Sequence, residues 1–429
     1  MMADKLRDAR EFILERIESG EFAGGEKLPS ARDLAEQTRI SFVIMQMAFI
    51  SLVTDGVLYT VPRRGTFVRN DWYERILPNS FWAGYEIYGS IFTQRILPHQ
   101  PAFRLSRRFQ SASFEVRSTL PAASLQQHFL NLSEFFDAEF PGKEDFFLQR
   151  IEQFRTPGGK LFALPLIFSP RGILCNRACF QEAGCRLPPQ DWNWNDFLDV
   201  IRQLRRRLPA GRIFPDLQLM HYWATCLTAL GGKILEKKGD ALEVALESEE
   251  SRKALEQLWT LAHMLLDENS DHCPERQCAM SLCARQDIVL LGSDGYILPL
   301  PHLPGEVGYS VVAGDLFCVR NTVNDFGVVR DMIRILLSEE VQDELGRRKF
   351  GIPIRRSSAI RSFDESDPVD RFYWSSVSKI HVEPCLLHPV CLQIFHAAML
   401  QAWREKRSVS EFIAEVAPVL RGIINYYRF

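Results

Sequence analysis

The chain has 429 residues, which is too long for one ordinary domain and sufficient for two or three domains with separate cores. It is 46% hydrophobic with a formal net charge of −3, so no overall basic excess indicates nucleic-acid binding and any such site must be local. Neither a signal-peptide pattern nor a run of about eighteen apolar residues occurs. We therefore expect a cytoplasmic protein without a membrane partner, in which the ten cysteines are free thiols.

Two helices are predicted at the start of the chain. Apolar residues recur at helical spacing over residues 4–18, between charged residues, and Gly20 ends this amphipathic helix. Ser30 stands directly before the segment "ARDLAEQ", and Asp33 follows three residues later. This is the pattern of a capping box, which begins a second, short helix.

A third helix is predicted within "ISFVIMQMAFISLVT", residues 40–54, which contains no charged residue. As a helix it would span roughly 22 Å, less than the ~30 Å of a bilayer's hydrocarbon core, so we do not expect it to cross a membrane. Ser41 can cap this helix, and Asp55-Gly56 ends it. The segments "VLYTV" and "TFV", on either side of "PRRG", predict a two-stranded hairpin. Three helices followed by a hairpin form a winged helix-turn-helix.

The segments "GEKLPSARDLAEQTRIS" and "DGVLYTVPRRGTFV" resemble the DNA-binding domain of the GntR family of bacterial transcription regulators, over roughly residues 4–69. The resemblance implies that the third helix enters the major groove and that the hairpin, or wing, touches DNA. An arginine fork matches phosphates or guanine edges, and a glycine at the wing tip lets the backbone approach the minor groove. The DNA-contacting residues expected on this basis are Ser30, Arg32, Ser41, Phe42, Gln46, Arg64, Gly65 and Thr66.

The third helix departs from the pattern of that family. Phe42 and Ile44 stand where the family usually carries Arg and Thr, and Gln46 occupies a commonly basic position. The helix spacing assigns one set of residues to the core and leaves another set outside it. The core set is Met45, Ala48, Phe49 and Leu52, and the remaining set is Phe42, Val43, Met47 and Ile50.

Two interpretations of this uncharged helix are open. It can read a thymine-rich major groove through methyl contacts, with Gln46 on adenine, or it can have become an interaction surface that no longer binds DNA. Residues 1–70 carry ten basic and ten acidic side chains, so attraction to phosphates requires a lopsided arrangement of charge. DNA reading is favoured, because Arg32 and "RRGTFV" have no obvious packing role.

The rest of the chain predicts a mixed α/β domain over residues 86–429, joined to residues 1–70 by a linker over 71–85. Strands are expected at 111–117, at 316–320 and as a pair within 160–175 that is broken at Ser169-Pro170. Helices are expected over 193–208 and 324–348.

Several segments, in order, resemble family 1 extracellular solute-binding proteins, the sugar-binding components of ABC importers. They begin with "GKLFALPLIFSPRGILCNRACFQEAGCRLPPQDWNWNDFLDVIRQL" and continue with "TALGGKIL", "SEESRKALEQLWTL", "ERQCAMSL" and "SEEVQDELGRRKFGIP". The resemblance covers about residues 125–425 and implies a two-lobed periplasmic-binding-protein-like fold of type II that closes on a small molecule. The first lobe is shorter than usual, and Cys175 stands where a Tyr is common.

A carbohydrate is the expected ligand, because sugar faces stack on aromatic rings and hydroxyls take polar groups. The ligand-binding candidates at strand ends are Ser169, Arg171, Trp223, Arg285 and Asp315. Three of them have a structural alternative: Trp223 can be a core residue, and Arg171 and Arg285 can be solvated loop residues.

No enzymatic or metal chemistry is expected. The spacing of His272, Cys273, Cys278 and Cys283 does not match the paired short spacings of structural zinc sites. The motifs of phosphate-binding loops, zinc proteases and serine hydrolases are absent, so we expect no cofactor.

The sequence therefore predicts a cytoplasmic transcription regulator that binds double-stranded DNA at a palindromic operator as a homodimer and senses a sugar. Two alternatives are an ABC-transporter-type solute-binding protein and a regulator-derived interaction module that no longer binds DNA.

Overall fold

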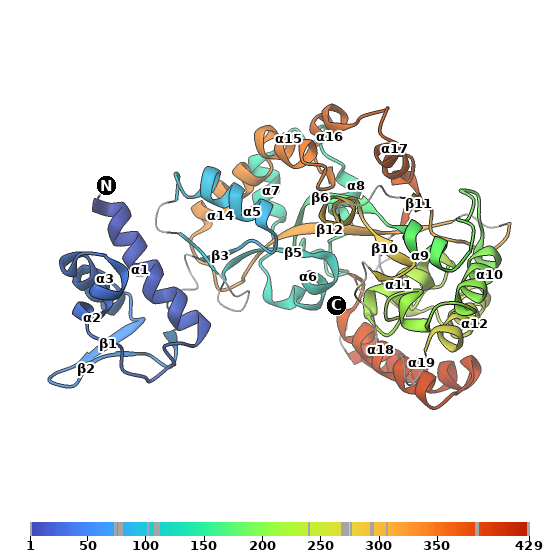
Figure 1. The fold of residues 1–429 in the computed structure, drawn as a ribbon, viewed down its shortest axis with the longest axis horizontal. Coiled ribbons are helices and arrows are strands. Elements are labelled where there is room, and N and C mark those ends of the chain that lie inside the picture. Colours follow the sequence, from blue (N-terminus) through green and yellow to red (C-terminus); the bar gives the residue numbers. More distant parts are fainter. Residues whose placement is uncertain are drawn as a thin grey trace. The chain divides into compact units, whose positions relative to one another are not determined.

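The computed structural model describes residues 2–72, 75, 80–100, 103–106, 112–238, 241–266, 274, 277–291, 296–305, 308–381 and 386–426 (Figure 1). The chain divides into two compact units. The first comprises residues 1–117, 128–130 and 317–335, and the second comprises 118–127, 131–316 and 336–429. Among the described residues, no helix combines the length and the apolar character that a membrane span requires.

The N-terminal elements form the winged helix-turn-helix that the sequence predicted. They are α1 Met2–Ser19, α2 Ala31–Thr38, α3 Phe42–Thr54, β1 Leu58–Val61 and β2 Gly65–Val68. The capping box that begins α2 is present: the Asp33 N–H donates to Ser30 Oγ at 3.2 Å, and the Ser30 N–H donates to Asp33 Oδ2 at 3.0 Å. Ser41 Oγ accepts from the Ile44 N–H at 3.4 Å and caps α3.

The two faces of α3 are the predicted ones. Met45, Ala48 and Leu52 are fully buried against α1 and α2, in one core with residues such as Ile13 and Leu34. The opposite face is open to solvent, with Phe42 46%, Val43 62% and Ile50 58% exposed. Ile44 also belongs to the core, so it is unavailable for contact with a partner. The described chain therefore leaves the outer face of α3 uncovered.

A seven-stranded sheet lies at the centre of one lobe. Its strands are β3 Ser80–Trp82, β4 Arg104–Leu105, β5 Phe114–Ser118, β6 Leu164–Pro170, β12 Ser310–Val319, β13 Ile352–Pro353 and β14 Ile380–His381. Their order is β13-β6-β12-β5-β3-β4, and β14 pairs with β12. β3 runs parallel to β4 and β5. β3 thus lies inside the range 71–85 that the sequence presented as a linker.

A smaller antiparallel sheet, in the order β10-β7-β11, belongs to the other lobe. Its strands are β7 Gly172–Cys175, β10 Met280–Cys283 and β11 Tyr296–Leu298. The chain leaves the large sheet at the end of β6 and enters the small one at β7, with Arg171 between them. The predicted pair of strands within 160–175 is therefore confirmed, with the break one residue later than expected. A separate hairpin pairs β8 Leu235–Lys238 with β9 Ala241–Val244.

Helices surround the two sheets. They are α5 Glu86–Ile91, α6 Thr119–Ser124, α7 Ser133–Glu139, α8 Leu148–Glu152, α9 Arg177–Glu182, α10 Trp194–Arg205, α11 Met220–Ala229, α12 Glu249–Leu265, α13 Arg285–Leu291, α14 Phe326–Leu336, α15 Glu339–Arg347, α16 Arg356–Ser362, α17 Pro368–Ser375, α18 Pro389–Arg404 and α19 Val409–Tyr426. Figure 1 shows the C-terminal pair α18 and α19 beside α12.

One predicted helix was right and another was wrong in its length. α10 occupies the middle of 193–208 and begins with a capping box between Asn193 and Asp196. The single helix expected over 324–348 is instead two helices, α14 and α15. Ser338 separates them, because its Oγ accepts from the Val341 N–H at 3.3 Å and begins a new helix.

The packing of α3 predicts unequal effects of two truncations on one helix. Leu52→Ala removes a fully buried side chain and should destabilise the winged helix-turn-helix by about 2–5 kcal/mol, whereas Ile50→Ala should cost less than about 0.5 kcal/mol. Hydrogen exchange of the α1–α3 amides in the full chain measures both effects. Equal loss of protection in the two variants would contradict this assignment of the faces.

Candidate functional site

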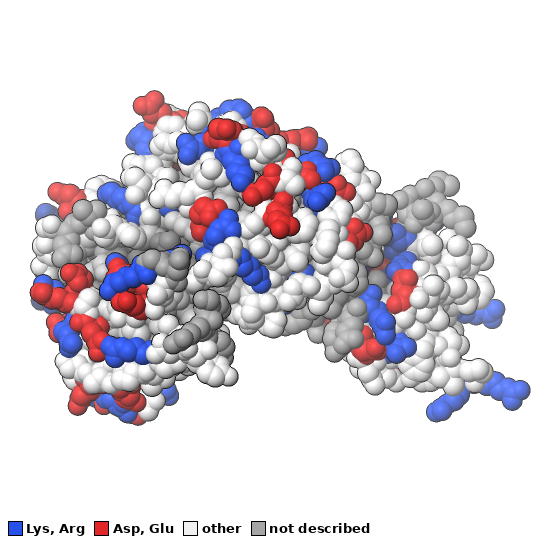
Figure 2. All heavy atoms as spheres, turned by 180° about the vertical axis from the view of Figure 1, so that it is seen from behind, with Lys and Arg blue, Asp and Glu red and all other residues white. Residues whose placement is uncertain are grey.

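The tip of the β1–β2 hairpin is a basic turn built around a glycine. Gly65 has a φ of +117°, and a Cβ placed on it would lie 2.7 Å from Lys27 Cε. Only glycine fits without strain or displacement of the lysine. Arg63 and Arg64 precede it and are exposed, and Figure 2 shows basic side chains projecting from this end of the N-terminal domain. The turn therefore carries two exposed guanidinium groups next to Gly65, whose backbone is not covered by a side chain of its own.

The charges of the winged helix-turn-helix are arranged in two groups. Some basic side chains are neutralised within the domain, as in the ion pairs Arg10–Asp55, Arg16–Glu21 and Arg69–Asp71. Others are exposed and form no ion pair with a carboxylate in the part of the chain that the structure describes; these are Lys5, Lys27, Arg32, Arg39, Arg63 and Arg64. A domain with equal numbers of acidic and basic residues thus keeps a set of free cations.

Arg32 and Phe42 are neighbours across the helix-turn-helix. The Arg32 guanidinium lies over the Phe42 ring, 5.6 Å from its centroid, which is within the range of a cation–π contact. Gln46 lies one turn further along α3, and its amide is exposed. The start of α3 therefore carries an apolar ring, an adjacent cation and an amide that can pair with a base edge.

The other residues expected at DNA are at the helix starts and in the wing. Ser30 and Ser41 use their hydroxyls as helix caps. Thr66 is half-buried, with its Oγ1 3.3 Å from Thr60 Oγ1 across the hairpin. The predicted DNA-contacting residues thus occupy α2, α3 and the hairpin of one small domain.

The second unit contains a cavity of about 510 Å³, within the size range of small-molecule sites. It is lined by residues that include Thr228, Gly232, Lys233, Glu250, Tyr309 and His381. None of them was among the expected ligand residues. A signal that could have found this place is the segment "TALGGKIL", which begins at Thr228 and was part of the family resemblance without a ligand role.

Two glycines shape the wall of this cavity. Gly231 has a φ of +80° and follows the end of α11. A Cβ on Gly232 would lie 2.5 Å from Leu227 Cδ1 and 2.8 Å from Ala254 Cβ. The backbone therefore packs directly on α11 and α12. Ser251 Oγ holds the next residue, accepting from the Lys233 N–H and donating to its carbonyl, both at 3.0 Å.

The cavity is lined by the charged side chains Lys233, Glu236, Lys237 and Glu250 and by the neutral polar groups of Thr228 and Tyr309. Thr228 is 7% exposed, and its hydroxyl has no hydrogen-bond partner among the described residues. The edge of the Tyr309 ring meets His381, with centroids 4.2 Å apart. Burial and the charges of Lys233 and Arg150 lower the pKa of His381, so its imidazole is neutral at pH 7 and can both donate and accept.

Three of the five expected ligand residues lie together near the crossover between the sheets. The Arg285 N–H donates to Ser169 Oγ at 3.0 Å, and the Arg171 N–H donates to Ser310 Oγ at 2.7 Å. The Arg285 guanidinium is 3.1 Å from Asp370 and 3.4 Å from Asp367.

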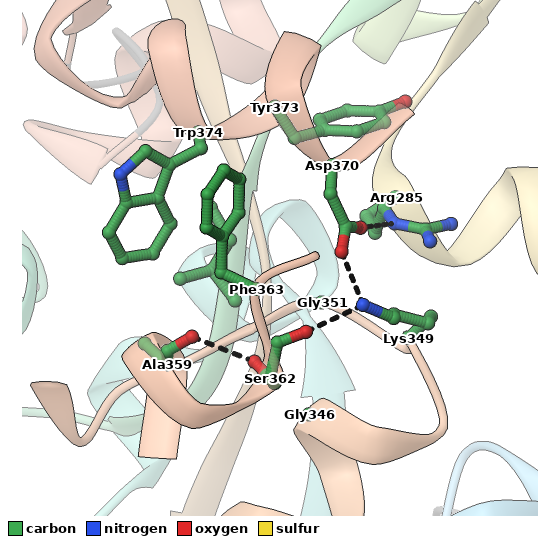
Figure 3. A pocket seen from close by; sticks show the side chains of 11 residues that line it. Arg285, Gly346, Lys349, Gly351, Ala359, Ser362, Phe363, Asp370, Tyr373 and Trp374 are labelled. Carbon is green, nitrogen blue, oxygen red and sulfur yellow. Dashed lines mark hydrogen bonds and ion pairs between the residues drawn. The ribbon is translucent and has the colours of Figure 1, made fainter. Parts of the chain in front are cut away.

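Asp370 is shared between two basic side chains. Figure 3 shows the side chains of Arg285 and Lys349 directed toward its carboxylate, beside Phe363 and Trp374. The cavity that these residues line is only about 30 Å³, which is too small for a sugar. Any ligand contact through Arg285 would have to replace carboxylates of the chain itself.

The other two expected ligand residues do not line the larger cavity. Trp223 is fully buried in α11, where its indole N–H donates to His396 Nδ1 at 2.9 Å and its ring packs on Phe395. Asp315 is fully buried in β12. The structure thus does not bring the five residues together in one place.

The four residues considered as a zinc site, His272, Cys273, Cys278 and Cys283, lie only partly within the described residues. His272 and Cys273 lie outside them, whereas Cys278 and Cys283 are buried. Burial raises the pKa of Cys283 to about 12, so it remains a thiol at neutral pH. Within the described ranges, no three His, Cys, Asp or Glu side chains are grouped to hold a metal ion.

The N-terminal domain matches a known family by sequence. Residues 6–68 match the family described as bacterial regulatory proteins, gntR family. A stretch of 67 residues is 39% identical to the HTH-type transcriptional repressor NagR of Bacillus subtilis, covering 16% of this chain and 28% of that repressor. The chain thus spans less than a third of the length of this relative.

The rest of the chain is similar to solved solute-binding proteins. An ABC transporter solute-binding protein from Thermotoga lettingae, bound with alpha-D-tagatose, superposes with a TM-score of 0.65 and 15% identity, over 80% of this chain and 99% of that one. An ABC substrate-binding protein from Listeria monocytogenes, in complex with cycloalternan, gives 0.63 and 12%, over 81% and 98%. Residues 6–68 are therefore a gntR-type helix-turn-helix domain, and the rest of the chain has the two-lobed α/β fold of ABC solute-binding proteins.

Proposed function

We propose that this protein is a cytoplasmic transcription regulator that binds double-stranded DNA through its winged helix and senses a carbohydrate in its two-lobed domain. The observation that carries the proposal is the union, in one chain, of a gntR-type domain with free cations and a solute-binding fold with a cavity of sugar size. It is not an enzyme in this proposal.

The surface of α3 supports DNA binding over an interaction surface covered by the rest of the chain. Phe42, Val43 and Ile50 are exposed, so the described residues leave this face free. Apolar side chains at these positions can contact thymine methyl groups, and Gln46 can pair with adenine. Because α3 supplies no cation, Arg32 and Arg64 provide the attraction to phosphates.

The chemistry of the larger cavity supports a carbohydrate effector. A hydroxyl, a neutral imidazole and a phenol ring are groups that bind sugar hydroxyls and pack on sugar faces. The two solute-binding proteins of similar fold hold a monosaccharide and an oligosaccharide in their structures. We propose Thr228, Tyr309 and His381 as ligand residues, whereas Ser169 and Arg171 lie where the chain passes from one sheet to the other.

A homodimer on a palindromic operator completes the proposal. One winged helix buries little surface on DNA, and two copies related by a twofold axis read two half-sites. The alternative of a transporter-associated binding protein is not favoured, since it leaves the gntR-type domain without a role.

Selection of bound fragments from a pool of genomic DNA, with and without a mixture of sugars, tests the proposal directly. We expect a palindrome with A/T-rich half-sites and a sugar-dependent yield. A thermal-shift screen checks sensing separately, because a hundredfold excess of ligand over its Kd stabilises the folded state by about 2.7 kcal/mol. Failure to recover any DNA would refute the regulator, and silence across the sugar panel would refute the sensor.

Arg64→Ala is expected to weaken binding to all DNA sequences by a similar factor. The substitution removes one phosphate contact, so the slope of log affinity against log salt should fall by about one. Fluorescence anisotropy at several salt concentrations measures both quantities. Arg16→Ala is the matched control, because Arg16 lies in the same domain but is paired with Glu21.

Gln46→Ala should differ from Arg64→Ala in a diagnostic way. A bidentate contact to adenine is worth about 1–3 kcal/mol at one base pair, so the loss should appear only with the preferred base. A uniform loss on all sequences would show that Gln46 does not read a base.

Thr228→Val should separate ligand binding from stability. The Thr228 hydroxyl is buried without a hydrogen-bond partner among the described residues, and burying such a group costs about 1–3 kcal/mol of stability. Removing it should therefore leave the Tm unchanged or raise it, while the increase in Tm caused by sugar should become smaller. Thr225→Val is the control on the same helix, since the Thr225 hydroxyl is already bonded to the His221 carbonyl at 2.6 Å. A lower Tm with an unchanged sugar shift would place Thr228 outside the ligand site.

A further inference from the structure

A buried ionic cluster joins α1 of the winged helix-turn-helix to the edge strand β4. It consists of Glu11, Glu18, Arg104 and Ser106, and we call it the Glu18 cluster. Arg104 donates from its two terminal nitrogens to the two oxygens of Glu18, at 2.8 and 2.9 Å. Its Nε lies 3.2 Å from Glu11 Oε2, and Ser106 Oγ donates to Glu18 Oε1 at 3.1 Å.

The cluster is almost completely removed from water. Glu18 is 0%, Ser106 4% and Arg104 6% exposed. A carboxylate at such a depth is costly unless it is paired and hydrogen-bonded, and Arg104 supplies both functions for Glu18. Separation of α1 from β4 would leave both charges uncompensated until water reached them. The contact between α1 and β4 is therefore either fully formed or fully open, because a partly separated ion pair without water is unfavourable.

On the DNA-binding side, α1 is firmly attached to α3. Glu11 and Glu18 are seven residues apart and share one side of α1, whereas Ala9 and Ile13 on another side are buried in the core with α3. Arg10 adds an ion pair to Asp55 at the end of α3, at 2.6 Å. Movement of α1 thus carries α3 with it.

On the sensor side, β4 belongs to the large sheet. It pairs with β3, β3 pairs with β5, and β5 neighbours β12. β12 pairs with β14 through Val311 and His381, and His381 lines the larger cavity. One hydrogen-bonded sheet therefore includes both a wall residue of the proposed ligand site and the residue that holds α1.

We propose that Arg104 is a positioning residue that holds the winged helix-turn-helix on the edge of the sensor's sheet and thereby makes the placement of α3 depend on the state of the sensor. The dependence on the sensor rests on the proposed function, whereas the positioning role does not. A continuous sheet does not by itself transmit a change between two sites; coupling is measured as the effect of sugar on DNA affinity.

The variants are chosen so that the fully buried Glu18 is never left as a lone charge; Glu11, which also loses Arg104 in the double variant, is partly exposed. Arg104→Met combined with Glu18→Gln removes the ion pair but keeps the size of both side chains, and Arg104→Lys keeps the charge without the two-pronged fork. Arg212→Met is the control, because the Arg212–Glu182 ion pair is exposed and lies within the second unit. Circular dichroism and the Tm confirm that each variant is folded.

The first measurement is the distance between two spin labels, placed as non-natural residues at the exposed positions Glu36 in α2 and Arg330 in α14. Electron double resonance should give one narrow distribution for the parent protein and for the Arg212 control. The double variant should give a broad distribution, and Arg104→Lys an intermediate one. A narrow distribution in the double variant would overturn the positioning role.

The second measurement is the ratio of the DNA Kd with and without an effective sugar. A coupling of roughly 5–150-fold is typical of allosteric proteins, and the double variant should reduce the ratio to near one while its Kd for sugar is unchanged. A purely structural anchor would not alter this ratio. An unchanged ratio would overturn the transmission role. If the parent protein shows no sugar effect although the distances broaden, the proposed sensing is wrong and the positioning role stands.

Discussion

The two-lobed architecture depends on one reciprocal hydrogen-bonded pair at the crossing between the sheets. Ser310 Oγ accepts from the Arg171 N–H at 2.7 Å and donates to the Arg171 carbonyl at 3.1 Å. Arg171 is the residue at which the chain leaves the large sheet, and Ser310 is the first residue of the strand that forms part of that sheet again. Both crossing segments are thereby held at one point by a hydroxyl that is almost completely buried. One hydroxyl thus satisfies both the N–H and the carbonyl of Arg171, and this joins the two segments where the chain passes between the sheets.

Local features of the fold were accessible from the sequence. The capping boxes at Ser30 and Asn193 act over three residues, so a short window contains all the information needed to place the helix starts. The two faces of α3 follow from helical spacing, because burial in a small three-helix domain repeats with the helix period. The boundary between α14 and α15, which the sequence analysis missed, also depends on neighbouring residues. Ser338 followed by Glu339 and Glu340 is the pattern of a helix start, although the apolar spacing continues across it.

The ligand site was not accessible in the same way. Thr228, Tyr309 and His381 are separated by more than seventy residues from one another, and only the tertiary fold makes them line one cavity. Arg285 looked like a free strand-end cation, but its carboxylate partners Asp367 and Asp370 lie more than eighty residues further on. Resemblance to a family indicated the fold. It could not identify side chains whose partners come from distant segments, because such pairs leave no periodic pattern in the sequence.

The Glu18 cluster has a consequence for how domains of this kind are combined. In an isolated winged helix, Glu18 would be an ordinary hydrated carboxylate on the outer side of α1, and the domain core formed by Ala9, Ile13 and their neighbours would be intact. In the full chain it is buried and paired with Arg104 of the sheet. The residues of α1 that meet the sheet and the residues of α3 that are open to solvent are different parts of one domain. A change at the acidic positions of α1 would therefore alter the surface on which the domain docks without changing any residue of the exposed face of α3.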